Sequence, residues 1–266
     1  MRGFVDLHSH VLPAIDDGAR DLTEALAMLR AAAASGTTTI AATPHLSADF
    51  PGVRVDELAC RCRQLRDAAA AAGIAVRLVA GAEVSLAWAL RASAQERVLA
   101  SYDQRGTDLL IETPSHNVVG LDMVLYDLRV SGCRITLAHP ERSVEFQRHP
   151  NRLVALVDQG VLLQVDAASL LTRQHRQRRS GANSLARHLC VSGLAHALAS
   201  DGHRSSSWRP VTDLAKAADV ATALVGAARA EWMTSTAPAA IIAGTPLSDS
   251  PAVVTARKRH RRLWRR

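Results

Sequence analysis

The chain has 266 residues, enough for one large domain and close to the roughly 250 residues of a typical α/β barrel. Apolar residues make up 48% of the sequence and aromatic residues only 3%, which favours alanine-rich helices on a sheet over an aromatic-rich β-sandwich. No apolar run approaches the ~20 residues of a membrane-spanning helix. Four cysteines without a CxxC motif, and no signal peptide before the first strand, predict reduced thiols in a cytoplasmic protein.

The positive charge is concentrated at one end of the sequence. The formal net charge is +7, and residues 257–266 contain seven Lys or Arg and no acid. The rest of the chain therefore carries no net charge, which argues against a nucleic-acid-binding surface spread over the fold. We predict a basic, disordered tail over residues 248–266, either simply solvated or in contact with an acidic partner or an anionic membrane surface.

Predicted strands alternate with amphipathic helices along most of the chain. After the first strand, Asp21 and Glu24 have the spacing of a helix N-cap and its acidic partner, and leucines then recur at helical intervals up to Gly36. From Val211 the pattern is helical again, with Pro238 as a break. The predicted strands lie at about residues 4–8, 38–43, 75–82, 108–113, 134–138, 161–165 and 194–199.

This alternation predicts the fold class. Strands separated by helices pair in parallel through right-handed crossovers. No GxGxxG sequence follows the first strand, so a dinucleotide-binding sheet is not indicated. We predict an α/β fold in which seven strand-helix units form a distorted, TIM-like (β/α)7 barrel, as one domain over residues 1–247.

Two histidines follow the first strand, in the sequence His8-Ser9-His10. Alternate residues of an extended chain share one face, so both imidazoles point the same way, and imidazole is a common ligand of Zn, Mn and Fe. An isolated His-x-His is equally compatible with two surface histidines, so the interpretation depends on the other strands.

The remaining strand ends carry further side chains of the same chemical types. Together with the first pair, the candidate metal ligands at strand ends are His8, His10, His45, Glu83, Glu112, His139, Asp201 and His203. The mouth of a barrel gathers such ends, and carboxylates crowded there would repel one another unless cations lay among them. Imidazole and carboxylate without thiolate suit two or three divalent ions, such as Mn, Fe or Zn.

Six short motifs carry a resemblance to a known family. The chain resembles the polymerase and histidinol phosphatase (PHP) family, and within it the metal-dependent tyrosine phosphatases associated with bacterial capsule and exopolysaccharide. The similarity runs from about residue 4 to about residue 210. Its motifs are His8-Ser9-His10, Asp16-Asp17-Gly18, Thr43-Pro44-His45, Gly81-Ala82-Glu83, Ala138-His139-Pro140-Glu141-Arg142 and Ser200-Asp201-Gly202-His203.

The resemblance implies a trinuclear site of the manganese type. One ion would be held by His8, His10, Glu83 and Asp201, and Glu83 would bridge to a second ion held with Glu112 and His139. The third would be held by Asp17, His45 and His203, with Asp16 outside the ligand set. Arg142 and Arg209 match the positions expected to bind the phosphate, although either could instead form a surface ion pair.

The resemblance also implies a reaction. We expect a phosphomonoesterase whose metal-bound hydroxide attacks phosphotyrosine on a bacterial tyrosine kinase that controls polysaccharide export. A phosphatase for a small metabolite such as histidinol phosphate is the alternative, because His116 and Asn117 depart from the family pattern near the substrate mouth. The basic loop 172–183 could help to hold an anionic substrate or could be simply solvated. From another class, an inactive kinase- or membrane-binding module would fit only if a ligand were missing.

A competing signal for cysteine-dependent phosphatases is present. Cys60 and Arg66 have the C-x5-R spacing of those enzymes. The residues between them contain no glycine and lie in a helical pattern, and a helix interior has no backbone N–H groups left for a phosphate. We therefore interpret the spacing as chance.

Overall fold

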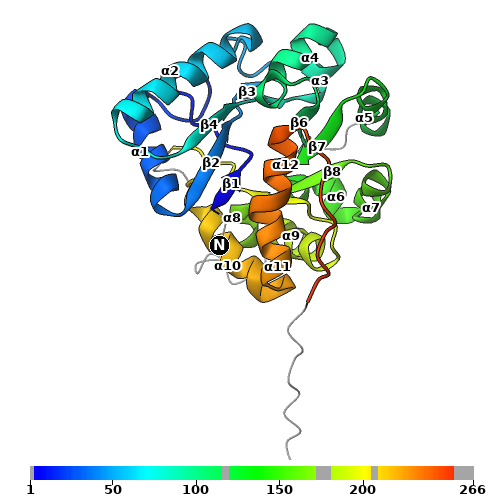
Figure 1. Cartoon of the computed structure of the whole chain (residues 1–266). Helices are drawn as coiled ribbons and strands as arrows, with labels where there is room; N and C mark the ends of the chain where they lie inside the picture. Colours follow the sequence, from blue (N-terminus) through cyan, green and yellow to red (C-terminus); the bar gives the residue numbers. More distant parts are fainter. Residues whose placement is uncertain (1–2, 116–119, 172–180, 205–208, 255–266) are drawn as a thin grey trace, which may run out of the picture.

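The computed structural model describes residues 3–115, 120–171, 181–204 and 209–254. Figure 1 shows the strands at the centre of the molecule with the helices around them. All seven predicted strands are present, and two strands of two residues each are additional. The strands are β1 (Phe4–Asp6), β2 (Thr37–Ala42), β3 (His45–Leu46), β4 (Arg77–Ala80), β5 (Glu83–Val84), β6 (Asp108–Glu112), β7 (Arg134–Ala138), β8 (Leu162–Asp166) and β9 (Ala197–Ala199).

The strands are parallel throughout and form two sheets, of order β1-β2-β4 and β3-β5-β6-β7-β8-β9. The two sheets are connected by the chain itself, because β3 follows β2 after Thr43 and Pro44, and β5 follows β4 after Gly81 and Ala82. This confirms the predicted parallel α/β class. No closed sheet forms among the described residues. The segments after β1 and β9 nevertheless meet, with a bridge between Ser9 and Gly202 and the amide of His10 2.8 Å from the Gly202 carbonyl.

The hydrophobic core has an outer and an inner part. The outer cluster packs helices such as α1 (Leu22–Ala34) and α2 (Leu58–Ala71) against strand residues such as Ile40 and Leu78. The inner cluster takes side chains from each of the seven long strands, from Leu7 and Tyr102 outside the strands, and from two isoleucines of α12 (Ala237–Ala243). Its members are Val5, Leu7, Ala41, Val79, Tyr102, Leu110, Ala138, Leu162, Ala197, Ala199, Ile241 and Ile242. Residues that alternate along a strand therefore serve two different cores.

The helices lie between the predicted strands and after the last of them, as the sequence predicts. They are α1 (Leu22–Ala34), α2 (Leu58–Ala71), α3 (Leu86–Arg91), α4 (Ala94–Ala100), α5 (Leu121–Val130), α6 (Val144–Arg148), α7 (Asn151–Asp158), α8 (Ala167–Leu170), α9 (Gly181–Val191), α10 (Asp213–Val225), α11 (Ala227–Glu231) and α12 (Ala237–Ala243). Short 3-10 segments are η1 (Val55–Glu57), η2 (Tyr102–Gln104) and η3 (Pro140–Arg142), and η4 (Trp232–Thr236) is π-helical. As predicted, the Asp21 side chain caps α1 by accepting a hydrogen bond from the Glu24 amide.

The prediction that Pro238 breaks the C-terminal helical region is wrong. Pro238 lies in the first turn of α12. The π-helical segment η4 precedes it, so α11, η4 and α12 follow one another without a loop. Helix α12 packs against β1 and β9 and brings Ile241 and Ile242 into the inner core.

Arg134 ties the start of β7 to the segment around α12. Its guanidinium contacts the buried carboxylate of Asp108 at 2.5 Å and donates to the carbonyls of Ala240 and Thr245 at 3.2 and 2.7 Å. We expect Arg134→Ala to lower the free energy of unfolding by about 2 kcal/mol, because Asp108 would be left buried without its cation. Urea unfolding measures this. Arg54→Ala, which removes an exposed ion pair with Asp56, should change it by less than about 0.5 kcal/mol, and an equal loss in both would contradict the assignment.

The last described residues run back over the helices. The Trp232 indole donates to the Ser248 hydroxyl at 3.1 Å, and the Val254 amide donates to the Val225 carbonyl at 2.9 Å. Residues 248–254, assigned to the tail on sequence grounds, thus contact α10 and η4, while the basic residues 257–266 lie outside the described part of the chain. No helix in the described ranges has the length and apolar character needed to cross a membrane.

Candidate metal centre

The nine predicted metal ligands meet at one end of the strands. His8 and His10 follow β1, Glu112 ends β6, His139 follows β7, and Asp201 follows β9. The carboxyl ends of parallel strands lie at the same edge, so residues far apart in sequence come together. They fall into four overlapping groups, and in each group one ligand atom per residue lies within 4.8 Å of the others: His10, Asp17, His45 and His203; His8, His10 and Asp201; His8, Glu83 and His139; His45, Glu83 and Glu112.

Glu83 is the centre of the cluster and is fully buried. Its Oε1 atom lies 2.8 Å from Nε2 of His139, and its Oε2 atom lies 3.0 Å from Nδ1 of His45. The same Oε2 is 3.3 Å from Nε2 of His8 and 3.5 Å from Nε2 of His10. One carboxylate therefore contacts four imidazoles, which come from the ends of β1 and β7 and from the start of β3.

The two histidines after β1 are held from behind. Nδ1 of His8 lies 3.0 Å from Oε1 of Gln164, and Nδ1 of His10 lies 2.8 Å from Oδ2 of Asp16. Both partners are acceptors, so in each neutral ring Nδ1 carries the hydrogen and Nε2 presents a lone pair. These two lone pairs face each other at 3.3 Å and face Oδ1 of Asp201 at 3.3 and 3.2 Å.

This geometry fits bound cations. In the ring forms that bind metals, two nitrogen lone pairs and the oxygens of Glu83 and Asp201 face one another across 3.2–3.5 Å, which is repulsive unless positive charge lies between them. Within the described ranges, Oε2 of Glu83, Oδ1 of Asp201, Oδ1 of Asp17 and Nδ1 of His139 are buried atoms that make no hydrogen bond. Buried polar atoms without partners are costly, and divalent ions would satisfy them.

A second part of the cluster surrounds Asp17, whose Oδ1 lies 3.2 Å from Nε2 of His203 and 3.6 Å from Nε2 of His45. The turn that presents Asp17 depends on Gly18, because a Cβ atom at that position would lie 2.0 Å from the carbonyl oxygen of His10. Asp16 turns the other way and accepts from the amides of Gly18 and His45 at 2.9 and 3.1 Å. The turn thus places Asp17 in the cluster, while the hydrogen bonds of Asp16 stabilise the turn.

Burial keeps the imidazoles of His139 and His203 neutral, and neighbouring groups keep the central acid ionised. Burial lowers the pKa of His139 to about 3, and the charge of Arg142 adds to this effect. Burial also lowers the pKa of His203 to about 4. Burial alone would raise the pKa of Glu83, but the imidazoles of His8 and His139 hold it well below its usual range. Neutral imidazole and ionised carboxylate are the forms that ligate metals.

Arg142 and Arg209, predicted to bind phosphate, converge on one oxygen of Asp201. Nη1 of Arg142 lies 2.7 Å from Oδ2, and Nη1 of Arg209 contacts the same atom. Arg209 is mostly buried, and burial together with the nearby charge of Arg142 lowers its pKa to about 10. Two guanidinium groups thus border the imidazole and carboxylate cluster, an arrangement that attracts an anion.

Sequence reasoning missed two supporting residues. Gln164 is fully buried in β8, and its polar side chain within an apolar run was the only available signal. Asp6 is two residues before His8, but its carboxylate accepts from the Ser200 amide and hydroxyl at 3.0 and 2.5 Å and does not enter the cluster. Burial raises the pKa of Asp6 to about 6. Asp6 therefore joins the end of β1 to the end of β9.

Two other predicted features cannot be placed. His116, Asn117 and most of the basic loop 172–183 lie outside the described residues. Of that loop, residues 181–183 are described and begin α9, where the Asn183 amide donates to the Ser169 carbonyl at 2.7 Å.

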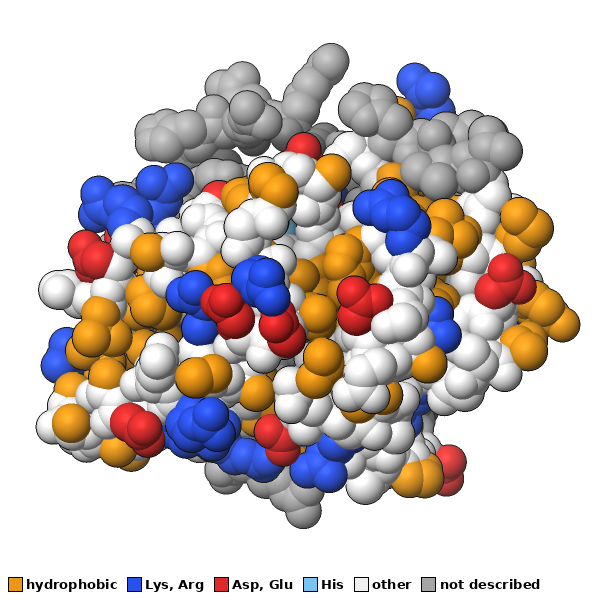
Figure 2. Space-filling model, turned by 90° about the horizontal axis from the view of Figure 1, so that it is seen from above, with side chains coloured by type: hydrophobic (Ala, Val, Ile, Leu, Met, Phe, Trp, Pro, Cys, Tyr) orange, Lys and Arg blue, Asp and Glu red, His pale blue; other side chains and the backbone are white. Residues whose placement is uncertain are grey.

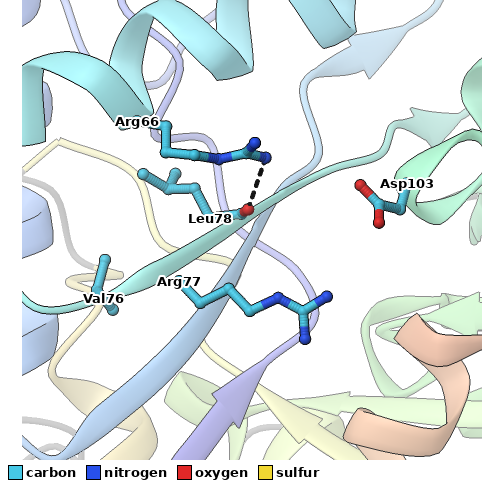
Figure 3. A pocket seen from close by; sticks show the side chains of 5 residues that line it. All are labelled: Arg66, Val76, Arg77, Leu78 and Asp103. Atoms are coloured by element: carbon cyan, nitrogen blue, oxygen red, sulfur yellow. Dashed lines mark hydrogen bonds between the residues drawn. The ribbon is translucent and has the colours of Figure 1, made fainter. Parts of the chain in front are cut away.

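A separate pocket of about 340 Å³ lies at the start of β4, lined by Arg66, Val76, Arg77, Leu78 and Asp103 (Figure 3). It contains none of the nine predicted ligands, and Glu83 follows the opposite end of β4. Arg66 donates to the Leu78 carbonyl at 3.0 Å, and Cys60 is exposed within α2. Cys60 and Arg66 thus lie in one continuous helix, as the sequence predicted, and form no phosphate loop.

Comparison with known proteins gives consistent matches. The family model for capsular polysaccharide synthesis, CpsB/CapC, matches residues 4–243. Tyrosine-protein phosphatase YwqE of Bacillus subtilis (strain 168) is 32% identical over 203 residues, 75% of this chain and 77% of that protein. Putative tyrosine-protein phosphatase CapC of Staphylococcus aureus is 28% identical over 200 residues, 75% of this chain and 76% of that protein.

A solved structure is also similar. It comes from the crystal structures of YwqE from Bacillus subtilis and CpsB from Streptococcus pneumoniae, described as unique metal-dependent tyrosine phosphatases. The TM-score is 0.79 at 27% sequence identity, and the match covers 95% of this chain and 100% of the other.

Proposed function

The chain belongs to the CpsB/CapC family of capsular polysaccharide synthesis, and from this premise we propose that it is a metal-dependent phosphomonoesterase acting on phosphotyrosine in a protein. The observation that carries the proposal is the crowding of nine imidazole and carboxylate side chains at one edge, with two arginines beside them. The substrate we propose is a bacterial tyrosine kinase that controls polysaccharide export.

We propose that the nine residues hold two or three divalent ions, with manganese the first candidate and iron or zinc the alternatives. His8, His10 and Asp201 would hold one ion, and Asp17, His45 and His203 another, while Glu83 would bridge the first to an ion shared with Glu112 and His139. When bound, such ions would polarise the phosphoryl oxygens and lower the pKa of a coordinated water.

The arginines would bind and orient the phosphate. A guanidinium donates through a planar fork of N–H groups that can grip two phosphoryl oxygens, and its charge offsets the charge that builds up in the transition state. Asp201 holds Arg142 and Arg209 at the border of the cluster through one oxygen and faces His8 and His10 with the other. The same carboxylate would therefore fix the phosphate-binding groups relative to the metal ligands.

Metal removal tests this proposal. Protein stripped with a chelator should lose at least about a hundredfold of its activity on a phosphotyrosyl peptide and regain it with Mn²⁺. Cys60→Ser is the control, and it should retain wild-type activity because Cys60 is exposed on α2. Full activity in protein shown to be free of metal, or loss of activity in Cys60→Ser, would reject the mechanism.

Two alternatives are separated by simple assays. A small-metabolite phosphatase should hydrolyse histidinol phosphate faster than a phosphotyrosyl peptide under the same conditions, and we expect the reverse. If the protein is an inactive binding module, any phosphatase activity in the preparation should be unchanged by His10→Ala or Asp201→Ala. We expect either substitution to abolish turnover. Nucleic acid is not the proposed substrate, because basic and acidic side chains are interspersed over the face shown in Figure 2.

We further propose that the two sheets wrap into a distorted barrel as one domain over residues 1–247. Support comes from the inner core cluster, which takes side chains from all seven long strands, and from the contacts between the segments after β1 and β9. A cytoplasmic location is also proposed, on the ground that Cys60, Cys62, Cys133 and Cys190 are free thiols.

The basic residues 257–266 would contact an acidic partner or an anionic membrane surface. Sedimentation with vesicles separates the two cases. Binding to anionic but not neutral vesicles, weakened by salt and lost when residues 255–266 are deleted, is the result expected for the membrane surface. Equal binding by the shortened protein would exclude this role.

A further inference from the structure

Strand β8 differs from the other strands at the ligand edge. The nine candidate ligands follow or occupy the ends of the other strands, and none comes from β8. Instead, β8 presents Gln164 and Asp166, both fully buried, on the face that also carries the inner-core residue Leu162. Leu163 and Val165, which alternate with them, pack into the outer core. Polar residues therefore occupy the inner face of β8 just below the cluster.

Gln164 contacts the cluster through a single atom. Its Oε1 lies 3.0 Å from Nδ1 of His8, across 156 residues of sequence, and both side chains are fully buried. Its neighbours on β7 and β9 are Ala138 and Ala197, whose small side chains leave room for the long amide. The amide nitrogen of Gln164 makes no hydrogen bond within the described ranges. Among the residues described, the side chain of Gln164 therefore bonds to His8.

We infer that Gln164 is a positioning residue that sets the tautomer of His8 and so prepares its Nε2 atom for a divalent ion. This inference rests on the proposed metal site. An amide oxygen can only accept, so it selects the ring form with hydrogen on Nδ1 and leaves the Nε2 lone pair directed at Glu83 and Asp201. It also fixes the plane of the ring in a site where each donor has several neighbours.

The choice of an amide has a physical reason. Asp16 performs the same task for His10 with a carboxylate, and it is 2.8 Å from that ring. A second carboxylate behind His8 would add negative charge to a fully buried position close to Glu83 and Asp201. The neutral amide orients His8 without this cost. The acceptor bonded to Nδ1 is thus charged for His10 and neutral for His8, while both rings present Nε2 to the cluster.

Three variants test the inference. Gln164→Leu removes the acceptor at similar size, Gln164→Glu keeps an acceptor, and Thr136→Val is the matched control. Thr136 lies on the inner face of neighbouring β7, is fully buried, and has a hydroxyl with no hydrogen bond in the described part of the chain. Mn²⁺ content and affinity would be measured by titration of chelator-stripped protein, and melting of the metal-free protein would report folding.

We expect Gln164→Leu to weaken binding at the site of His8 by about 10–100-fold. Gln164→Glu should restore most of this affinity, because bound cations offset the charge that it adds, while the metal-free Gln164→Glu protein should melt below wild type. Thr136→Val should match wild type in both measurements. Wild-type affinity in a folded Gln164→Leu protein, or the same loss in Gln164→Glu, would overturn the positioning role while leaving the proposed function intact. A wild-type protein that binds no Mn²⁺, Fe²⁺ or Zn²⁺ would overturn both.

A measurement on the unaltered protein covers the case in which Gln164→Leu does not fold. Imidazole ¹⁵N spectra of protein loaded with diamagnetic Zn²⁺ distinguish a ring protonated at Nδ1 from one protonated at Nε2. We expect His8 to carry its hydrogen on Nδ1. Hydrogen on Nε2 of His8 would overturn the inference.

Discussion

Glu83→Gln is expected to lower kcat/KM for a phosphotyrosyl peptide by on the order of 10³-fold or more. The carboxylate of Glu83 contacts all four of His8, His10, His45 and His139. Glutamine has nearly the same shape, so packing is preserved while the charge that would offset bound cations is lost. The metal content of the purified variant should fall together with its activity.

Glu57→Gln is the matched control for this substitution. Glu57 is an acid in η1 whose side chain is 41% exposed and pairs with Arg61 at 2.8 Å, and the same change there should leave kcat/KM and metal content at wild-type values. Metal analysis and steady-state kinetics on both variants decide the matter. A Glu83→Gln protein with full activity and a full complement of metal would contradict the bridging role that we propose for Glu83.

The strand ends could be predicted from sequence because short apolar runs alternate with amphipathic helical stretches. Local interruptions could not be predicted. The interval between β5 and β6 holds two helices, because Ser93 caps α4 through a capping box with Glu96 and so begins a new helix after Ala92. The π-helical segment η4 also has no sequence signature, and it is what allows the chain to continue into α12 at Pro238.

The candidate site shows the same division. Ligand-type residues at strand ends could be named from their positions and from the family resemblance, and the structure brings all nine together, although their roles as ligands remain a proposal. The residues behind them were not named, because a hydrogen bond such as that of Gln164 to His8 links positions 156 residues apart. Asp6 and Ser200 are 194 residues apart. Such pairs depend on the register of strands that only folding brings together.

Arg142→Ala is expected to lower kcat/KM by about 10²–10³-fold, the usual effect of removing one charged donor from a transition state. Arg142 is the last residue of η3, the segment that begins directly after His139. It donates to Asp201 at 2.7 Å, and its side chain is 33% exposed. It is thus near enough to solvent to meet a phosphate and near enough to the cluster to hold it there. Inhibition by inorganic phosphate should weaken in parallel, while metal content stays unchanged.

Two further arginine variants show whether this loss comes from phosphate binding. Arg142→Lys should recover only part of the activity, because an ammonium is a point charge and cannot grip two oxygens in a plane. Arg152→Ala removes an arginine whose side chain is 32% exposed, close to that of Arg142, but which pairs with Asp122 and Glu145 away from the cluster. It should behave as wild type. Unchanged phosphate inhibition in Arg142→Ala, or an equal loss in Arg152→Ala, would remove Arg142 from the phosphate site and leave only a structural contact with Asp201.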